Sequence, residues 1–438
     1  MPAEHTRRTF FSFATAAAVA ATQQKSLVAA NDKVDVAIIG LGGRGQSHMN
    51  VYAKLPGANI IALCDVNQAA LERAQAKVKG LTGKTPKGYA DMRQVFDDKE
   101  VQAVSMPVPN HWHALATIWA CEAGKDVYIE KPACHNIFEG QQMIAAARKY
   151  GRMVQVGSQS RSMDHKLKAI RLLNEGVIGK VYLAKGLCFK KRLPIGHKAD
   201  EPTPPGLDWD KFLGPAPMRP YNELRFAYNW HWFWDTGNGD IGNQGIHEMD
   251  IARWGLGKGL PSSVSSTGGK YYTLPDDDQE TPNTQMATFH YDDAELMFEV
   301  RGGVTGPEGG LQIRGGNTVG NLFYGSEGWM AVDSAGFQVY KGAKQEKVMD
   351  EVKTPGDDSV PHMSNFVAAV KSREYKSLNA EIEIGVASAD LVHLANTSYR
   401  LKRMLKFDEA TRKYIGDEEA NRMLTRNYRK PYIVPEKV

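Results

Sequence analysis

The chain has 438 residues, a formal net charge of +4, and hydrophobic residues at 42% of its positions. This length predicts two or three domains, and this hydrophobic share is enough for ordinary buried cores. The first thirty residues carry Arg7, Arg8 and Lys25 against Glu4, so the remaining chain is nearly neutral. Because no basic stripe is present, nucleic acid is not expected as a partner.

The N-terminal segment, residues 1–30, resembles a twin-arginine export signal. Arg7 and Arg8 precede an Ala-rich stretch, and residues 28–30 offer the small side chains of a cleavage site. The apolar run of about a dozen residues is too short to cross a bilayer. We therefore expect a periplasmic mature protein that begins near Asn31 and has no membrane span. A basic tail without a targeting role is the alternative.

The cysteines and histidines do not follow a metal-binding pattern. No C-x-x-C pair occurs, and the His and Asp pairs have no companions at ligand spacing. The sequence therefore predicts four buried thiols, no disulfide and no metal site, for Cys64, Cys121, Cys134 and Cys188.

The apolar run Val34–Ile39 is followed directly by a G-x-G-x-x-G pattern. Its glycines are Gly40, Gly42 and Gly45; a helical pattern and a second apolar run follow, and that run ends at Asp65. Asp65 lies twenty positions after Gly45, the spacing of the acid that binds the adenosine ribose of a dinucleotide. Gly40 permits a tight turn, Gly42 lets the backbone approach the pyrophosphate, and Gly45 allows close helix packing.

The acid also bears on the choice of dinucleotide. The carboxylate of Asp65 would accept hydrogen bonds from ribose hydroxyls and repel a 2′-phosphate, which favours NAD. Arg44 within the turn and Asn67 after the acid leave NADP as the alternative.

Strands and helices continue to alternate through residue 157. Strand patterns at 101–106, 126–129 and 153–156 are separated by helical patterns, which predicts a doubly wound parallel sheet, a Rossmann domain over residues 31–157. Ligands bind such sheets at the carboxyl ends of the strands. We therefore predict cofactor contacts from these residues: Gly40, Gly42, Arg44, Gly45, Asp65, Pro107, Asn110, His113, Glu130 and Lys131.

Three further motifs follow in order. Residues 109–113 match P-N-x-x-H, residues 123–132 match A-G-K-x-V-x-x-E-K-P, and residues 239–250 contain G-x-H-x-x-D. Together with the glycine pattern they resemble the Gfo/Idh/MocA family of glucose–fructose oxidoreductase, inositol dehydrogenase and rhizopine-catabolism proteins. The likeness extends from about residue 33 to residue 405.

The resemblance implies an α+β second domain, residues 158–405, with a large, mostly antiparallel sheet, and a homo-oligomer, either a dimer or a tetramer. Strand-like runs at 181–189 and on both sides of Asp292 are compatible with it. Helical patterns at 360–371 and 382–404 are expected to pack back on one of the two domains. The polar segment 406–438 is expected to be an arm that wraps a partner subunit or lies loose.

The resemblance also implies the catalytic residues. Lys131 matches the E-K-P lysine, whose ammonium can stabilise alkoxide character on a substrate oxygen. His247 matches the histidine that takes the hydroxyl proton, and Asp250 is expected to orient its ring. Several polyol dehydrogenases of the family have an aspartate where this chain has Asn243, which puts the base role on His247 alone. Asp240 is the weaker substitute.

An aromatic stretch, residues 228–235, precedes that motif. Flat aromatic faces stack on sugar C–H groups and the polar residues among them bind hydroxyls, so a carbohydrate site is predicted here. A hydrophobic plug between domains or a subunit contact is the alternative. The predicted substrate-binding residues are Trp230, His231, Trp232, Trp234, Asn243 and Asp250. The Pro- and Gly-rich segment 192–219 is expected to line or cover the pocket.

The sequence therefore predicts an exported, NAD-dependent oxidoreductase that transfers a hydride between the cofactor and a secondary alcohol of a sugar or glycoside. A tightly held, recycled cofactor is expected because the periplasm offers little free NAD. One alternative is a glycoside hydrolase that works by transient NAD redox. A non-catalytic, NAD-binding sugar sensor is the other.

Overall fold

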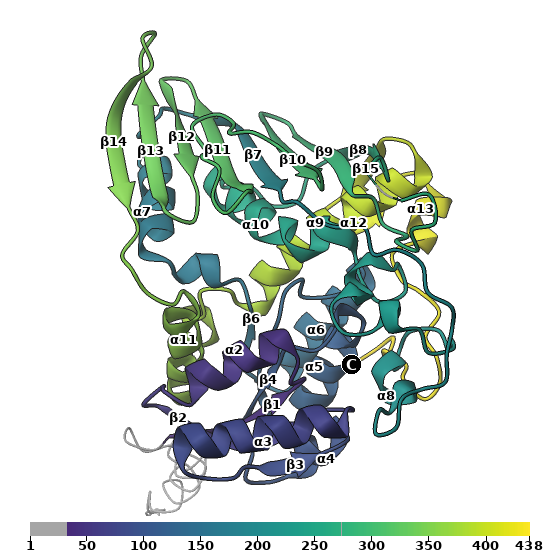
Figure 1. Cartoon of the computed structure of the whole chain (residues 1–438). Coiled ribbons are helices and arrows are strands. Elements are labelled where there is room, and N and C mark those ends of the chain that lie inside the picture. The colour runs from purple at the N-terminus through teal and green to yellow at the C-terminus, as the bar shows by residue number, and fades with distance from the viewer. Residues whose placement is uncertain (1–32, 273) are drawn as a thin grey trace, which may run out of the picture.

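The computed structural model describes residues 33–272 and 274–438, which form two layered units one above the other (Figure 1). The predicted export signal lies outside the described residues. None of the helices within the described ranges is long and apolar enough to cross a membrane.

The first unit is built on a six-stranded parallel sheet in the order β3-β2-β1-β4-β5-β6. Its central strands are apolar and buried on both faces, as strands of parallel sheets are. This confirms the predicted doubly wound sheet. The strands are β1 (Val34–Ile39), β2 (Ala58–Cys64), β3 (Lys87–Tyr89), β4 (Ala103–Met106), β5 (Asp126–Ile129) and β6 (Val154–Val156).

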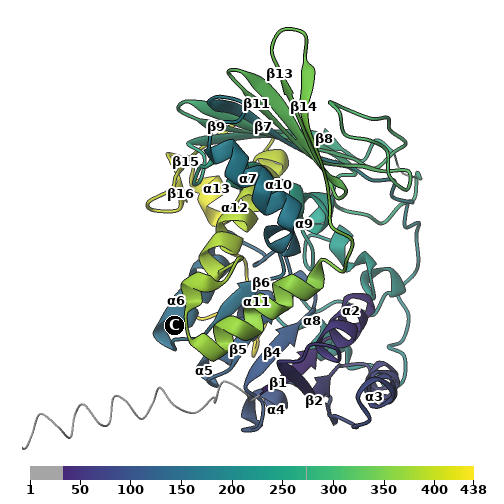
Figure 2. The same cartoon turned by 90° about the vertical axis from the view of Figure 1, so that its left-hand side faces the viewer.

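Helices cover both faces of this sheet, and one of them comes from far along the chain. Met363, Phe366 and Val367 of α11 (Ser359–Ser372) pack in one core with the strands around Val36 (Figure 2). A helix from the C-terminal third therefore completes the Rossmann unit. The other helices are α2 (Gly43–Tyr52), α3 (Gln68–Thr82), α4 (Met92–Asp97), α5 (His113–Glu122) and α6 (Ile137–Lys149).

The second unit has a ten-stranded sheet in the order β14-β13-β12-β11-β7-β10-β9-β8-β15-β16. Only the central pair β7–β10 is parallel; the other pairs are antiparallel, which confirms the predicted, mostly antiparallel sheet. The strands are β7 (Val181–Phe189), β8 (Ser263–Gly269), β9 (Thr284–Tyr291), β10 (Ala294–Arg301), β11 (Thr318–Gly325), β12 (Gly328–Val332), β13 (Gly336–Lys341), β14 (Glu346–Val352), β15 (Leu405–Asp408) and β16 (Lys413–Tyr414).

Helices cover the face of this sheet that is turned toward the Rossmann unit (Figure 1). Ile246 and Met249 of α10 pack against Phe298 and Phe323 of the sheet, and Leu394 of α12 joins the same core. This packing places the start of α10 above the carboxyl edge of the parallel sheet. The helices of this unit are α7 (Asp164–Asn174), α9 (Gly239–Asn243), α10 (Gly245–Leu256), α12 (Ile382–Leu401) and, near its edge, α13 (Glu418–Arg422).

Residues 190–238, here called the insertion, connect β7 to α9 and fold back onto the Rossmann unit. The amide of Asp208 donates to the carbonyl of Val66 at 2.9 Å, and the amide of Gln68 donates to the carbonyl of Gly206 at 2.9 Å. Around α8 (Trp209–Leu213) the insertion has an apolar cluster of its own. It is therefore an ordered wall beside the end of β2.

The C-terminal segment packs on its own chain, so the expectation that it lies loose is wrong, whereas the expectation that it wraps a partner subunit stays a prediction. Tyr432 and Val434 are buried in the core of the Rossmann unit together with Trp112. Arg429 pairs with Asp210 of α8 at 2.6 Å. These apolar and charged contacts hold the segment between the Rossmann unit and the insertion.

Candidate active site

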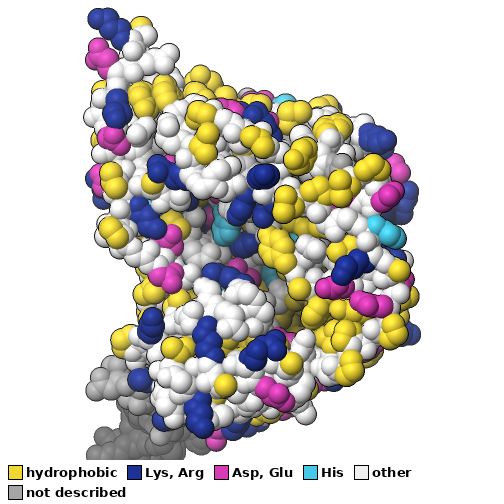
Figure 3. All heavy atoms as spheres, viewed as in Figure 1, with side chains coloured by type: hydrophobic (Ala, Val, Ile, Leu, Met, Phe, Trp, Pro, Cys, Tyr) yellow, Lys and Arg dark blue, Asp and Glu magenta, His cyan; other side chains and the backbone are white. Residues whose placement is uncertain are grey.

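A pocket of about 740 Å³ lies between the carboxyl edge of the parallel sheet and the insertion. Figure 3 shows the surface hollowed between the two units, with His and basic side chains on the walls. The lining comes from the glycine turn, Asp65, the ends of β4 and β5, the insertion, and Tyr432 near the C-terminus. The volume suits a ligand larger than a single sugar.

The glycine turn has the shape that a pyrophosphate requires. Gly40 has φ +94°, and a Cβ there would come within 2.9 Å of the carbonyl oxygen of Pro107. A Cβ on Gly45 would collide with the carbonyl oxygen of Gly40. A Cβ on Gly42 would meet nothing within 4 Å, so the backbone before α2 is open to the pocket. The predicted roles of the three glycines therefore fit the geometry, and a dinucleotide fits the site.

Asp65 lines the pocket at the end of β2. Its Oδ2 accepts from the amide of Leu41 at 2.7 Å, and its Oδ1 accepts from the amide of Asn67 at 2.8 Å. Burial raises the pKa of this carboxyl, and the two amides oppose the shift. Each oxygen keeps a lone pair for a ribose hydroxyl, so the residue can act as predicted.

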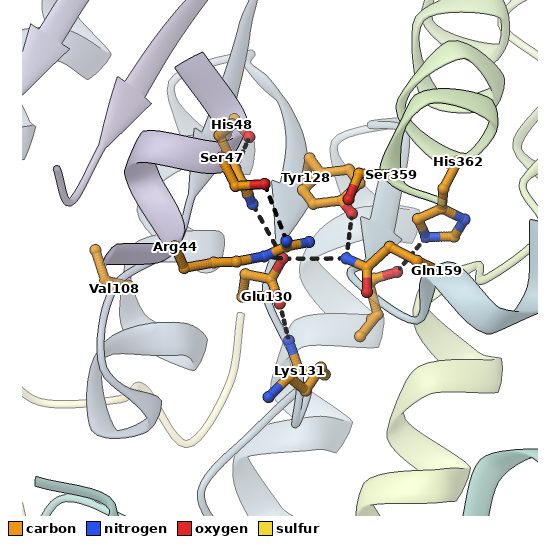
Figure 4. A network of polar contacts seen from close by, with 12 residues as sticks. Arg44, Ser47, His48, Val108, Tyr128, Glu130, Lys131, Gln159, Ser359 and His362 are labelled. Atoms are coloured by element: carbon orange, nitrogen blue, oxygen red, sulfur yellow. Dashed lines mark hydrogen bonds and ion pairs between the residues drawn. The ribbon is translucent and has the colours of Figure 1, made fainter. Parts of the chain in front are cut away.

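Glu130, at the end of β5, is the centre of a buried polar network (Figure 4). Its Oε1 accepts from Arg44 Nε at 2.7 Å and Gln159 Nε2 at 3.2 Å, and it contacts His48 Nε2 at 3.0 Å. Burial raises the pKa of Glu130, but the charge of Arg44 and the bond to His48 outweigh burial and hold it well below its usual range. The guanidinium of Arg44 thus pairs with Glu130 through Nε and also donates to Ser47 Oγ through Nη1.

Lys131 extends into the same pocket. Its Nζ donates to the backbone carbonyl of Asn243 at 2.8 Å, the one acceptor that the described residues offer it. Burial lowers the pKa of Lys131, and the charge of Glu130 opposes that shift. An ammonium has three protons, so two remain for a ligand.

His247 lies in the first turn of α10 and is partly exposed. Burial lowers its pKa to about 3, and the positive charge of Lys131 adds to the shift. Its ring makes no hydrogen bond to any residue in the described ranges. At neutral pH the imidazole is therefore uncharged.

Two insertion residues join the site without having been predicted for it. Arg192 binds the carboxylate of Asp240 with two hydrogen bonds, Nε–Oδ2 at 2.9 Å and Nη2–Oδ1 at 2.7 Å. The hydroxyl of Tyr228 accepts from Asn243 Nδ2 at 2.7 Å. Asp240 is thus fully engaged and is not the substitute base. Arg192 lies in a Lys-Lys-Arg run with no motif spacing, so its role had no signal; Tyr228 stood inside the aromatic stretch.

Asn110 and His113 lie behind the pocket wall, not on it. Asn110 Nδ2 donates to Asn238 Oδ1 at 3.0 Å. The ring nitrogens of His113 contact the carbonyl oxygens of Pro132 at 2.6 Å and Val108 at 2.9 Å. Neither side chain lines the pocket, so the predicted direct contact of both residues with a cofactor does not fit these positions. They hold the loops that carry Pro107 and Lys131.

Asp250 is also remote from the pocket. Its carboxylate binds Arg161 Nε at 2.8 Å and accepts from Ser388 Oγ at 2.6 Å, and both charged side chains are at most 5% exposed. The prediction that it binds substrate or orients His247 is wrong because its carboxylate is buried and already bound to Arg161 and Ser388.

The aromatic stretch divides into two groups. Trp230 and His231 line the pocket, and their rings are stacked at 3.6 Å. Trp232 is buried under the guanidinium of Arg192, and Trp234 lines a separate, smaller pocket. Trp232 and Trp234 are therefore not placed to bind a substrate in the main pocket.

Comparisons with known proteins agree with this architecture. A family model described as "Oxidoreductase family, NAD-binding Rossmann fold" matches residues 34–158. Its companion, "Oxidoreductase family, C-terminal alpha/beta domain", matches residues 163–294 and 330–434. The chain belongs to the Gfo/Idh/MocA family.

The curated relatives have low sequence identity to this chain. A glycosyl hydrolase family 109 protein from Shewanella sp. (strain W3-18-1) is 27% identical over 154 residues, 34% of each chain. The chain thus spans about a third of the length of the curated relatives it matches. Two solved structures have the same fold. An aldose-aldose oxidoreductase from Caulobacter crescentus, complexed with glycerol, has a TM-score of 0.65 at 19% identity and covers 86% of this chain and 100% of its own. A levoglucosan dehydrogenase in complex with NADH has a TM-score of 0.65 at 17% identity and covers 86% and 99%.

Proposed function

We propose that the protein oxidises a secondary alcohol of a sugar or glycoside with NAD. The observation that carries this proposal is that Lys131, whose ammonium keeps two free protons, lines the pocket and is near enough to His247 for its charge to help lower the pKa of that imidazole. Trp230 and His231 add an aromatic wall for a sugar face.

The residues divide the reaction between them. Bound NAD supplies the hydride acceptor at nicotinamide C4. Lys131 donates to the substrate oxygen and stabilises negative charge on it as the C–H bond breaks. His247 takes the hydroxyl proton, so the alcohol becomes a carbonyl and one proton remains on the imidazole. In the reverse direction His247 would return the proton, and the reduced nicotinamide would supply the hydride.

Two features support NAD over NADP and tight retention of the cofactor. Asp65 places a carboxylate where a 2′-phosphate would be repelled, and Arg44, the basic residue of the turn, is bound to Glu130. The insertion and Tyr432 cover the pocket, which would slow dissociation. Retention suits an exported enzyme, and we propose export from the likeness of residues 1–30 to a twin-arginine signal.

We also propose that the protein forms a dimer or a tetramer. Met286 and Met297, 51% and 38% exposed, lie on the face of the large sheet that faces away from its helices. Light scattering after size-exclusion chromatography measures the oligomer, and a monomer at micromolar concentration would contradict this.

The second candidate is a glycoside hydrolase that works by transient redox. The likeness to family 109 glycosyl hydrolases favours it. It would use the same first oxidation, followed by loss of the aglycone, addition of water and reduction. A sugar sensor is the third reading, and a Lys131→Ala variant that loses no function would favour it.

The test is made on the purified protein. Bound nucleotide is extracted and identified, and absorbance of reduced nicotinamide is followed while sugars and glycosides are added. NAD that is reduced by a sugar supports the dehydrogenase. Release of free aglycone without accumulated NADH supports the hydrolase. A protein that binds neither NAD nor NADP overturns the proposal.

A further inference from the structure

Tyr228 belongs to the insertion and lines the pocket, with its side chain half-exposed. Its ring packs against His231 at 4.7 Å and, edge to face, against Trp232 at 6.1 Å between centroids. The residue before it, Ala227, has φ +52°, in the left-handed region that residues other than glycine seldom adopt. The phenol is thus held in one place by its neighbours while its edge stays open to the pocket.

The hydroxyl of Tyr228 accepts two hydrogen bonds. One comes from Arg192 Nη1 at 3.1 Å, and a guanidinium can only donate. The other comes from Asn243 Nδ2 at 2.7 Å. The orientation of that amide follows from Asp240, since the same Nδ2 lies 3.4 Å from a carboxylate oxygen that can only accept.

These two donors occupy both lone pairs of the phenol oxygen. Its own proton then has to point elsewhere, and no acceptor for it is found among residues 33–272 and 274–438. The open direction is the pocket. A positive guanidinium at the same oxygen also stabilises the negative charge that grows there when the hydroxyl donates strongly.

Asn243 contacts both Lys131 and Tyr228 and so links the hydroxyl of Tyr228 to the ammonium of Lys131. Its backbone carbonyl accepts from Lys131 Nζ at 2.8 Å while its side chain donates to Tyr228. One residue therefore positions the ammonium and the phenol together, on the same side of the pocket.

We propose that Tyr228 is a further catalytic residue, whose hydroxyl donates to the reacting substrate oxygen beside Lys131. This rests on the proposed function. The ammonium of Lys131 and the hydroxyl of Tyr228 together stabilise the developing alkoxide, and His247 remains the group that takes the proton. The hydrogen bond of Tyr228 strengthens as negative charge develops on the oxygen, so it acts on the rate more than on binding.

The test compares Tyr228→Phe with Tyr271→Phe, a control on an exposed tyrosine. We expect kcat of Tyr228→Phe to fall by about 100-fold, with KM and NAD affinity changed less than about threefold. A substrate deuterated at the reacting carbon should show a larger isotope effect in this variant, because hydride transfer becomes more rate-limiting. A merely structural role would not enlarge it.

Asn243→Ala supplies the second variant, since it removes the amide but keeps the carbonyl that holds Lys131. We expect about a tenfold loss of kcat, and a double variant that loses no more than Tyr228→Phe does alone. A Tyr228→Phe enzyme within threefold of wild type, or fully additive losses in the double variant, overturns the inference alone. A wild-type protein that neither binds nor reduces NAD overturns the proposed function, and the inference with it.

Discussion

Replacing Asp250 by Asn leaves the guanidinium of Arg161 buried without a counter-charge. In the wild type this carboxylate makes three contacts with Arg161, at 2.8, 2.8 and 3.0 Å, and also accepts from Ser388. The two side chains are 5% and 1% exposed, so solvent does not screen the pair. The charge of Arg161 lowers the pKa of Asp250 against the effect of burial, as expected of a strong ion pair.

The cost follows from the burial. Removing one partner of a buried pair costs about 3–5 kcal/mol of unfolding free energy, because the other charge stays behind. With a urea dependence of about 3 kcal/mol per molar, the midpoint of denaturation falls by about 1–1.7 M. Asp350→Asn is the matched control: its partner Lys347 and Asp350 are 44% and 46% exposed, so solvent screens the pair and we expect almost no change in the midpoint.

The assay is urea denaturation followed by tryptophan fluorescence, with KM measured on the folded fraction. If Asp250 has a structural role, the Asp250→Asn variant should be less stable than wild type but have an unchanged KM. An Asp250→Asn protein as stable as wild type but with a raised KM would refute this reasoning and restore the residue to substrate binding.

Three other perturbations test other parts of the structure. Gly42→Ala should keep wild-type stability but weaken NAD binding, because its methyl group enters the space next to the pyrophosphate. Gly45→Ala should lower the melting temperature, because its methyl group would collide with the carbonyl oxygen of Gly40. Equal stability of the two variants would contradict this. Burial raises the pKa of Glu248 to about 7, so from about pH 4.5 to 7 the folded state keeps a proton that the unfolded chain has released, and stability falls as pH rises. Glu248→Gln should gain up to about 3 kcal/mol over wild type between pH 4.5 and 7.5 in urea titrations, and parallel pH curves would exclude the effect. Tyr432→Ala removes a ring that packs on Trp112 at 5.3 Å and a bond to α8, so bound NAD should dissociate faster in a competitor chase, whereas the half-exposed Ile433→Ala should release it at the wild-type rate.

The local patterns predicted several strands of both units well. β1, β5 and β7 have the bounds that their apolar runs indicate, and β9 and β10 are joined at the predicted turn. A short strand such as β3, Lys-Gly-Tyr, was missed because its exposed side chains have no apolar pattern. Periodicity acts over neighbouring residues, so it identifies elements but not their distant partners.

The candidate site was predictable where a motif fixes the spacing. Gly40, Gly42, Asp65, Glu130 and Lys131 follow strand ends, and the fold brings them to one edge. Arg192 and Tyr228 lie in segments that were predicted to border the pocket, but their individual roles were not predicted, because an irregular insertion has no periodicity that indicates where its side chains point. Asp250 was misassigned since its helix position alone does not reveal that Arg161, from a distant segment, would bury it.

The place of Tyr432 in the pocket wall has a consequence for the order of assembly. This residue lies after every other lining residue in the chain, so it is the last of them to leave the ribosome. Until then the groove beside Trp112 has no occupant, and the dinucleotide cleft is open on that side. The wall of the pocket is therefore incomplete until the residues around Tyr432 have been synthesised.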